Sequence, residues 1–159
     1  MVGTAGDRLL SEFGVRLGLP ELAFDDNLSL LAFDGMEVEI EHRPNQRIFF
    51  VSAELAQLSR QMPAVVLGRL MELNFVSVMV GVGAIALDPS NGTLSLAARF
   101  PIARATVDDL SDFIKDFIDQ LEGLKALLAR PAFLSADSAV TVPAPGRDDD
   151  LGILGMIRV

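Results

Sequence analysis

The sequence predicts an α+β domain with a twisted antiparallel sheet, in the order helix, three strands, helix, two strands, helix. Three observations lead to this class. Strand-like stretches alternate apolar and polar residues, other segments repeat apolar residues every three or four positions, and the strand-like stretches follow one another without an intervening helix. Successive strands joined by short turns form antiparallel sheets, whereas a parallel sheet needs strands and helices to alternate.

The first half of the chain is predicted to form one helix and a three-stranded meander. Apolar residues at helical spacing run from about Gly6 to Leu17. Strands over Leu28–Phe33 and Met36–Glu41 are separated by Asp34-Gly35, a pair typical of a tight hairpin turn. A third strand is expected over residues 47–55, which are rich in β-branched and aromatic side chains.

The second half is predicted to add a helix, a hairpin and a long final helix. The middle helix is expected from about Pro63 to Asn74. Strands over residues 76–87 and 93–102 flank a turn-forming cluster. Thr106 is the expected N-cap of the last helix, whose apolar residues recur at threes and fours as far as Leu128.

Composition also predicts where the folded domain ends. The domain is expected to span residues 1–130, followed by a linker over residues 131–150 that is rich in Pro, Ala, Ser and Asp. Residues 151–159 form an apolar C-terminal tail segment. A disordered terminus is the alternative interpretation of this region.

Charge and residue counts argue against several classes of partner. The chain has 13 Lys and Arg against 22 Asp and Glu, a net charge of −9, which disfavours nucleic acid and anionic membrane surfaces. It has no Cys and one His, so we expect no metal site and no cofactor. No secretory signal or membrane span is predicted, and a cytoplasmic protein is expected.

One arrangement of polar residues leaves an enzyme as an alternative. Glu37, Glu41 and His42 could line a pocket in a small α+β enzyme or ligand-binding domain. The more ordinary interpretation is that His42 lies in a surface turn and that the glutamates keep one face of a strand soluble.

Apolar residues are more abundant than a small domain needs. We expect the middle helix and the strand after it to supply a self-complementary dimer interface. Two alternatives remain open: these residues complete the core, or the chain is a purely structural dimer.

Six local strings, taken in order, resemble a known family. They are Leu9–Gly14, Leu17–Pro20, Asp25–Phe33, Leu70–Phe75, Gly83–Asp88 and Leu96–Pro101. Together they resemble the class I type III secretion chaperones of the Tir-chaperone family, over about residues 9–128.

This resemblance implies a cytoplasmic bacterial homodimer without catalytic activity. Such a chaperone binds the N-terminal segment of one or more secreted effectors in extended form and keeps it soluble and competent for secretion. The secretion-apparatus ATPase is a further candidate partner. The effector-binding candidates are Phe13, Leu17, Leu28, Leu30, Phe33, Val38, Ile40, Phe49 and Val51. The dimer-interface candidates are Leu67, Leu70, Met71, Leu73, Phe75, Val78 and Val80. Which of the strand residues face the effector and which face the core is left open.

The C-terminal segment departs from the family pattern. We hypothesise that residues 151–159 pair with an open sheet edge or occupy the effector groove until an effector displaces them.

Overall fold

A computed structural model describes residues 4–59 and 62–135 and contains the expected order of elements. In chain order these are α1 (Ala5–Arg16), β1 (Leu28–Phe33), β2 (Met36–Arg43), a 3-10 turn η1 (Pro44–Gln46), β3 (Ile48–Gln57), α2 (Ala64–Val80), β4 (Ala84–Leu87), β5 (Thr93–Pro101), α3 (Val107–Leu128) and α4 (Pro131–Leu134).

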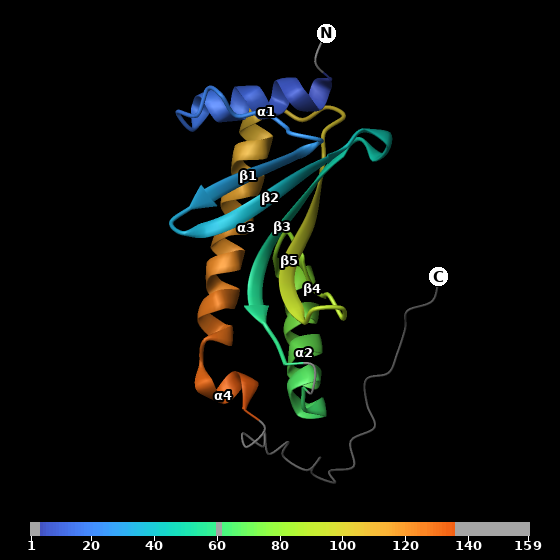
Figure 1. The fold of residues 1–159 in the computed structure, drawn as a ribbon, viewed down its shortest axis with the longest axis vertical. Helices are drawn as coiled ribbons and strands as arrows, with labels where there is room; N and C mark the ends of the chain where they lie inside the picture. The colour runs from blue at the N-terminus through green and yellow to red at the C-terminus, as the bar shows by residue number, and fades with distance from the viewer. Residues whose placement is uncertain (1–3, 60–61, 136–159) are drawn as a thin grey trace, which may run out of the picture.

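The strands form one antiparallel sheet in the order β1-β2-β3-β5-β4, so β1 and β4 are its two edges (Figure 1). The predicted Asp34-Gly35 hairpin is confirmed, and both residues have positive φ angles of 48° and 81°. Positive φ at both central residues is typical of the hairpin turn that matches strand twist.

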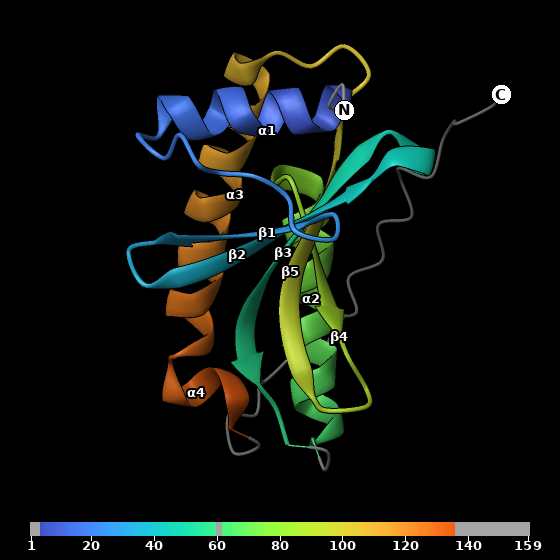
Figure 2. The same cartoon turned by 45° about the horizontal axis from the view of Figure 1, so that its top comes forward.

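All three long helices lie on one side of the sheet. α3 runs behind it, α1 crosses above one end, and α2 lies behind β4 and β5 (Figures 1 and 2). α3 buries one stripe of side chains at helical spacing, from Leu110 through Phe117 to Leu128. The inward side chains of the strands complete a single core, and no helix of the described residues lies over the opposite, outer face of the sheet.

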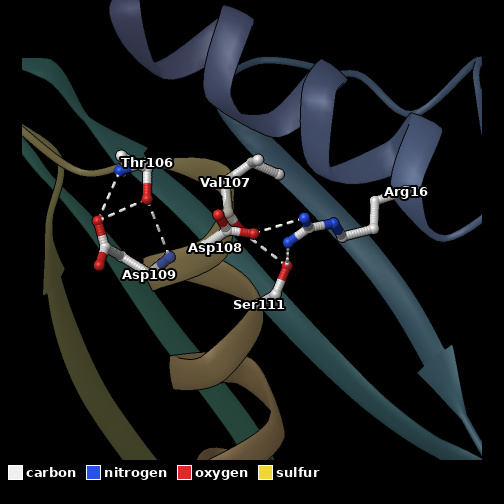
Figure 3. Close-up of polar contacts among 6 residues, drawn as sticks. All are labelled: Arg16, Thr106, Val107, Asp108, Asp109 and Ser111. Atoms are coloured by element: carbon white, nitrogen blue, oxygen red, sulfur yellow. Dashed lines mark hydrogen bonds and ion pairs between the residues drawn. The ribbon is translucent and has the colours of Figure 1, made fainter.

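Polar contacts at the start of α3 fix it to α1 (Figure 3). Thr106 is the N-cap, as predicted: its hydroxyl accepts from the Asp109 backbone N–H at 3.2 Å, and its own N–H donates to the Asp109 carboxylate at 2.8 Å. Those bonds hold the pKa of Asp109 below its ordinary value. Arg16, at the end of α1, pairs with Asp108 at 2.5 Å and donates to the Ser111 hydroxyl at 3.2 Å.

The prediction of a strand over residues 76–87 is wrong in its first half. α2 continues through Val80, and β4 covers Ala84–Leu87 alone. Val66, Leu70 and Ser77 are buried at helical spacing, so tertiary packing outweighs the small helix penalty of the β-branched valines.

A short helix stands at the start of the predicted linker. α4 is held against α2 by Arg69, whose guanidinium donates to the carbonyl oxygens of Ala132, Phe133 and Ser135 at 2.9–3.1 Å. The fold therefore extends to residue 135. The rest of the linker and the apolar tail segment lie outside the described residues.

Candidate client-binding and dimerisation surfaces

Most of the exposed large apolar side chains among the described residues lie on α2. Leu67, Met71, Phe75 and Val78 are three or four positions apart, so they share a side of the helix. Met71 and Phe75 are 66% and 68% exposed. We call these four residues the α2 stripe. Val65, Val76, Met79 and Val80 extend the exposed apolar surface beyond it.

Composition explains why α2 cannot bury all its apolar side chains in one copy of the chain. Of its 17 residues, Arg69 and Glu72 are the charged ones. A helix that is apolar on nearly all sides is stable when both faces are covered. The sheet and α3 cover one face, and the α2 stripe is left for another surface.

The seven predicted dimer-interface residues differ in how exposed they are in the structure. Leu67, Met71, Phe75, Val78 and Val80 are exposed, Leu73 is half-buried, and Leu70 is buried in the core. Leu70 therefore supports the fold of the single chain. Val78 and Val80 lie on the helix and not on the predicted strand. Val65, Val76 and Met79 are exposed on α2 as well but were not among the seven predicted residues, and their helical spacing was the available signal.

A second exposed surface lies at the opposite edge of the sheet. Leu30 points outward from β1 and is 63% exposed, while Leu28 and Phe33 on the same strand are half-buried. Leu17, at the end of α1, is 40% exposed. Among residues 4–59 and 62–135, Asp25 bridges to Leu28 through two backbone hydrogen bonds, and no strand pairs with the outer side of β1 beyond it. An extended peptide could hydrogen-bond along this edge.

Five of the nine predicted effector-binding residues are core residues instead. Phe13, Val38, Ile40, Phe49 and Val51 are each 2% exposed or less. The strand residues alternate with exposed ones because successive side chains point to opposite faces of a sheet, and α1 and α3 cover the inward face. Period-two alternation identified the apolar faces of β2 and β3, and their burial places those faces in the core.

Side-chain amides bind backbone N–H groups of β4 and of the turn that leads into it. Asn74 on α2 accepts from the backbone N–H of Ile85 at 2.7 Å. Gln120 on α3 accepts from the backbone N–H groups of Val82 and Gly83 at 2.9 and 3.1 Å, and its amide nitrogen donates to the Ser77 hydroxyl. Sequence analysis did not single out either amide.

Charges are unevenly spread on the outer face of the sheet. Glu37, Glu39 and Glu54 line a shallow depression around Leu30. Further along the same face, the Arg43 guanidinium lies 4.2 Å from the centre of the Phe50 ring and pairs with Glu41 at 2.6 Å. That hydrogen bond lowers the pKa of the Glu41 carboxyl.

The residues proposed for an enzyme pocket do not converge. Glu37 and Glu41 are on the outer face of β2, whereas His42 points to the inner face. His42 is 4% exposed and not in a surface turn, because its ring is stacked on Phe24 and lies edge-on to Phe49. A Cβ on Gly6 would collide with the His42 ring, so α1 approaches β2 closely at this glycine.

Two grooves run along the C-terminal end of α2, one on each side. The α2–α3 groove, of about 500 Å³, has Leu73, Val76 and Val80 on one wall and Asp116 and Asp119 on the other. The α2–sheet groove, of about 530 Å³, lies where the end of α2 meets the sheet beside β4 and β5. Its lining residues include Phe50, Val78, Val82, Ala84, Ala86 and Arg99.

Comparison with known protein families identifies the class of protein to which this chain belongs. The model of the Tir chaperone protein (CesT) family matches residues 8–125. The chain belongs to this family. A search of curated proteins found no match. The family model describes chaperones.

Solved structures of secretion chaperones share the fold. The crystal structure of the ExsC-ExsE complex aligns with a TM-score of 0.66 at 22% identity, covering 77% of this chain and 92% of that one. The HopA1-SchA chaperone-effector complex aligns with a TM-score of 0.65 at 14% identity, covering 77% and 94%. The Yersinia pestis type III secretion chaperone SycH, in complex with a fragment of YscM2, aligns with a TM-score of 0.57 at 21% identity, covering 76% and 99%.

Neither a membrane-spanning helix nor a metal cluster is found in the part of the chain that the structure describes. No helix there combines the length and hydrophobicity needed to cross a bilayer. No group of three or more His, Cys, Asp or Glu side chains there is placed to hold a metal ion.

Proposed function

We propose that this chain is a dimeric type III secretion chaperone that binds an extended segment of a secreted effector. The observation that carries the proposal is the pairing of two unlike surfaces on one small fold: the exposed α2 stripe and the open β1 edge. Family membership supports the same interpretation, since the family model describes chaperones.

The α2 stripe fits a second copy of the chain. Large apolar side chains that stand out from a rigid helix are typical of interfaces between folded partners. Two copies related by a twofold axis can place the same stripe on both sides of one interface. Both helices would then be covered on the faces that a single copy leaves exposed.

The β1 edge fits an extended effector segment. An added strand takes its affinity from backbone hydrogen bonds and its selectivity from alternate side chains. Leu28, Leu30 and Ala32 alternate along β1 on the outer face. With the core residues removed from the nine candidates, Leu17, Leu28, Leu30 and Phe33 remain as the proposed contacts.

The proposed place of action is the bacterial cytoplasm, where an effector waits before export. Chaperone–effector complexes among the structural neighbours support an effector as the partner. The secretion-apparatus ATPase is proposed as a later partner, after the effector has bound.

Binding to an N-terminal segment of a type III secreted effector from the same bacterium tests the function. Native mass spectrometry should give two copies of this chain for each segment, and hydrogen exchange should protect β1 amides in the complex. A segment of the same composition in scrambled order is the control. Equal binding of both segments, or no binding at all, would refute the proposal.

A further inference from the structure

The α2–sheet groove lies apart from the proposed effector contacts and meets the α2 stripe at Val78 alone. It has a volume of about 530 Å³, and Arg99 is the charged residue on its rim. Val78 and Val82 line it from α2 and the turn that follows, and β4 contributes only the small side chains of Ala84 and Ala86. The groove suits an apolar segment that carries negative charge at one end.

The chain itself contains a segment with this pattern. Asp148-Asp149-Asp150 immediately precedes Leu151–Val159, in which Leu151, Ile153, Leu154, Met156 and Ile157 are apolar. We propose that residues 148–159 bind in the α2–sheet groove of their own chain. The three aspartates lie toward Arg99, and the apolar residues that follow lie against Val78 and Val82.

The start of the C-terminal segment is held at the right helix. Arg69 fixes α4 and the carbonyl of Ser135 to the first half of α2. Residues 136–147 can span up to roughly 40 Å when extended. α2 has 17 residues and is therefore about 25 Å long. The connecting residues can bring the segment to the far end of α2.

Charge distinguishes this groove from its neighbour. In the α2–α3 groove, Asp116 and Asp119 would repel the three aspartates of the segment. Asp119 is only weakly compensated, by an exposed Lys115 at 3.9 Å. Arg99 attracts the same aspartates in the α2–sheet groove, so the segment prefers that side of α2.

Modest affinity is enough, because the segment is tethered. A tether of this length supplies an effective concentration of roughly a millimolar. A bound segment would cover Val78 at one end of the α2 stripe. The inference does not depend on effector binding, and its test needs no effector.

Engineered cysteine pairs in the full-length chain give a direct test, because the natural sequence has no Cys. One variant combines Ala86→Cys, in the α2–sheet groove, with Ile153→Cys. The matched variant combines Gly123→Cys, in the α2–α3 groove, with Ile153→Cys. A side chain at Gly123 meets no atom within 4 Å, so this substitution is tolerated. Disulfide formation is followed at low protein concentration by non-reducing electrophoresis and peptide mass spectrometry.

The proposal expects an intramolecular disulfide in the first pair that forms at least about tenfold faster than in the second. Adding Arg99→Gln should slow the first pair several-fold, and raising the salt concentration should do the same. Equal rates in the two pairs, or no disulfide, would overturn the proposal. A disulfide between two chains would assign the groove to the segment of a second copy and also overturn it. A rate unaffected by Arg99→Gln would overturn the proposed orientation.

Discussion

The two edges of the sheet have the same backbone chemistry and opposite surroundings. At β4, Asn74 and Gln120 occupy backbone N–H groups of Ile85, Val82 and Gly83, and α2 lies alongside. At β1, Asp25 exchanges two backbone hydrogen bonds of 2.8 Å with Leu28, and past that bridge no strand of the described residues pairs with the outer side of β1. One edge is closed and the other is open.

The difference shows how one small sheet can serve two kinds of partner. At the β4 side, the exposed apolar surface belongs to α2, which lies alongside the strand. A helix is rigid, so its surface suits binding to another folded copy of the chain. Leaving β1 open exposes backbone groups, which suit a chain without structure of its own. The two edges differ because amide side chains from α2 and α3 bind backbone groups at the β4 side, and not because the strands themselves differ.

The largest effect is expected at the α2 stripe. Met71→Asp combined with Phe75→Asp should convert the dimer to a monomer, because two charges would be buried in the interface. The loss of two central apolar contacts should raise the dimer Kd about 100-fold or more. Light scattering over a dilution series measures it.

Val15→Asp is the matched control for the stripe, since Val15 is an exposed apolar residue of α1 at 63% exposure. Val15→Asp should leave the molar mass measured by light scattering at the value of the dimer. A double variant that remains a dimer would remove the α2 stripe from the interface.

The next effect separates the open edge from the closed one. Leu30→Lys on β1 should weaken effector binding roughly tenfold, because lysine on an edge strand opposes addition of another strand and an apolar contact is lost. Leu87→Lys, on β4 and 41% exposed, should leave the affinity unchanged. Calorimetric titration with an effector segment measures both, and the reverse ranking would contradict an effector site at β1.

Opening the closed edge is expected to cost folding stability. Gln120→Leu leaves the backbone N–H groups of Val82 and Gly83 without their acceptor, which should lower the free energy of unfolding by about 1–3 kcal/mol. Amide exchange at those two residues should rise. Gln120→Glu keeps the acceptor oxygen but loses the N–H that donates to Ser77. Its free energy of unfolding should lie between those of the unmodified chain and Gln120→Leu. Glu122→Gln on the same helix is the control, and amide exchange as slow as in the unmodified chain would show that Gln120 does not close the edge.

The smallest effect is expected at the start of α3, away from both edges. Thr106→Ala removes an N-cap and should cost about 1 kcal/mol in urea unfolding. The pKa of Asp109 is lowered in the folded state, so its contribution is present above its unfolded pKa and is lost as pH falls through the folded value.

An Asp109→Asn variant tests this dependence. The difference in free energy of unfolding between this variant and the unmodified chain should be constant above about pH 4 and shrink in more acidic solution. A deficit independent of pH would show that the charge of Asp109 is not involved.

Local patterns in the sequence were sufficient for most of the fold. The Asp34-Gly35 turn, the Thr106 cap and the alternation of Met36, Val38 and Ile40 depend on neighbouring residues alone. The prediction of a strand over residues 76–80 was wrong. Valines at every second position are typical of a strand, but Ser77 is buried one turn before the end of α2, and this packing favours a longer helix.

The candidate site was predicted less completely, for a physical reason. Periodicity identifies an apolar face but not what covers it. Val38, Ile40, Phe49 and Val51 were therefore indistinguishable in the sequence from effector contacts until α1 and α3 were seen to lie over them. Leu70 and Met71 are neighbours in sequence, yet one is core and the other is exposed.

The order of elements, the turns and caps, and the excess of apolar residues around α2 depend on short-range backbone and solvent preferences, so they could be predicted from the chain. Which apolar residues remain exposed, and which sheet edge stays open, became known from the packed fold. Those properties depend on residues far apart in the chain, such as Gln120 beside Val82 and Arg69 beside Ser135. Their contacts exist only after the helices have packed.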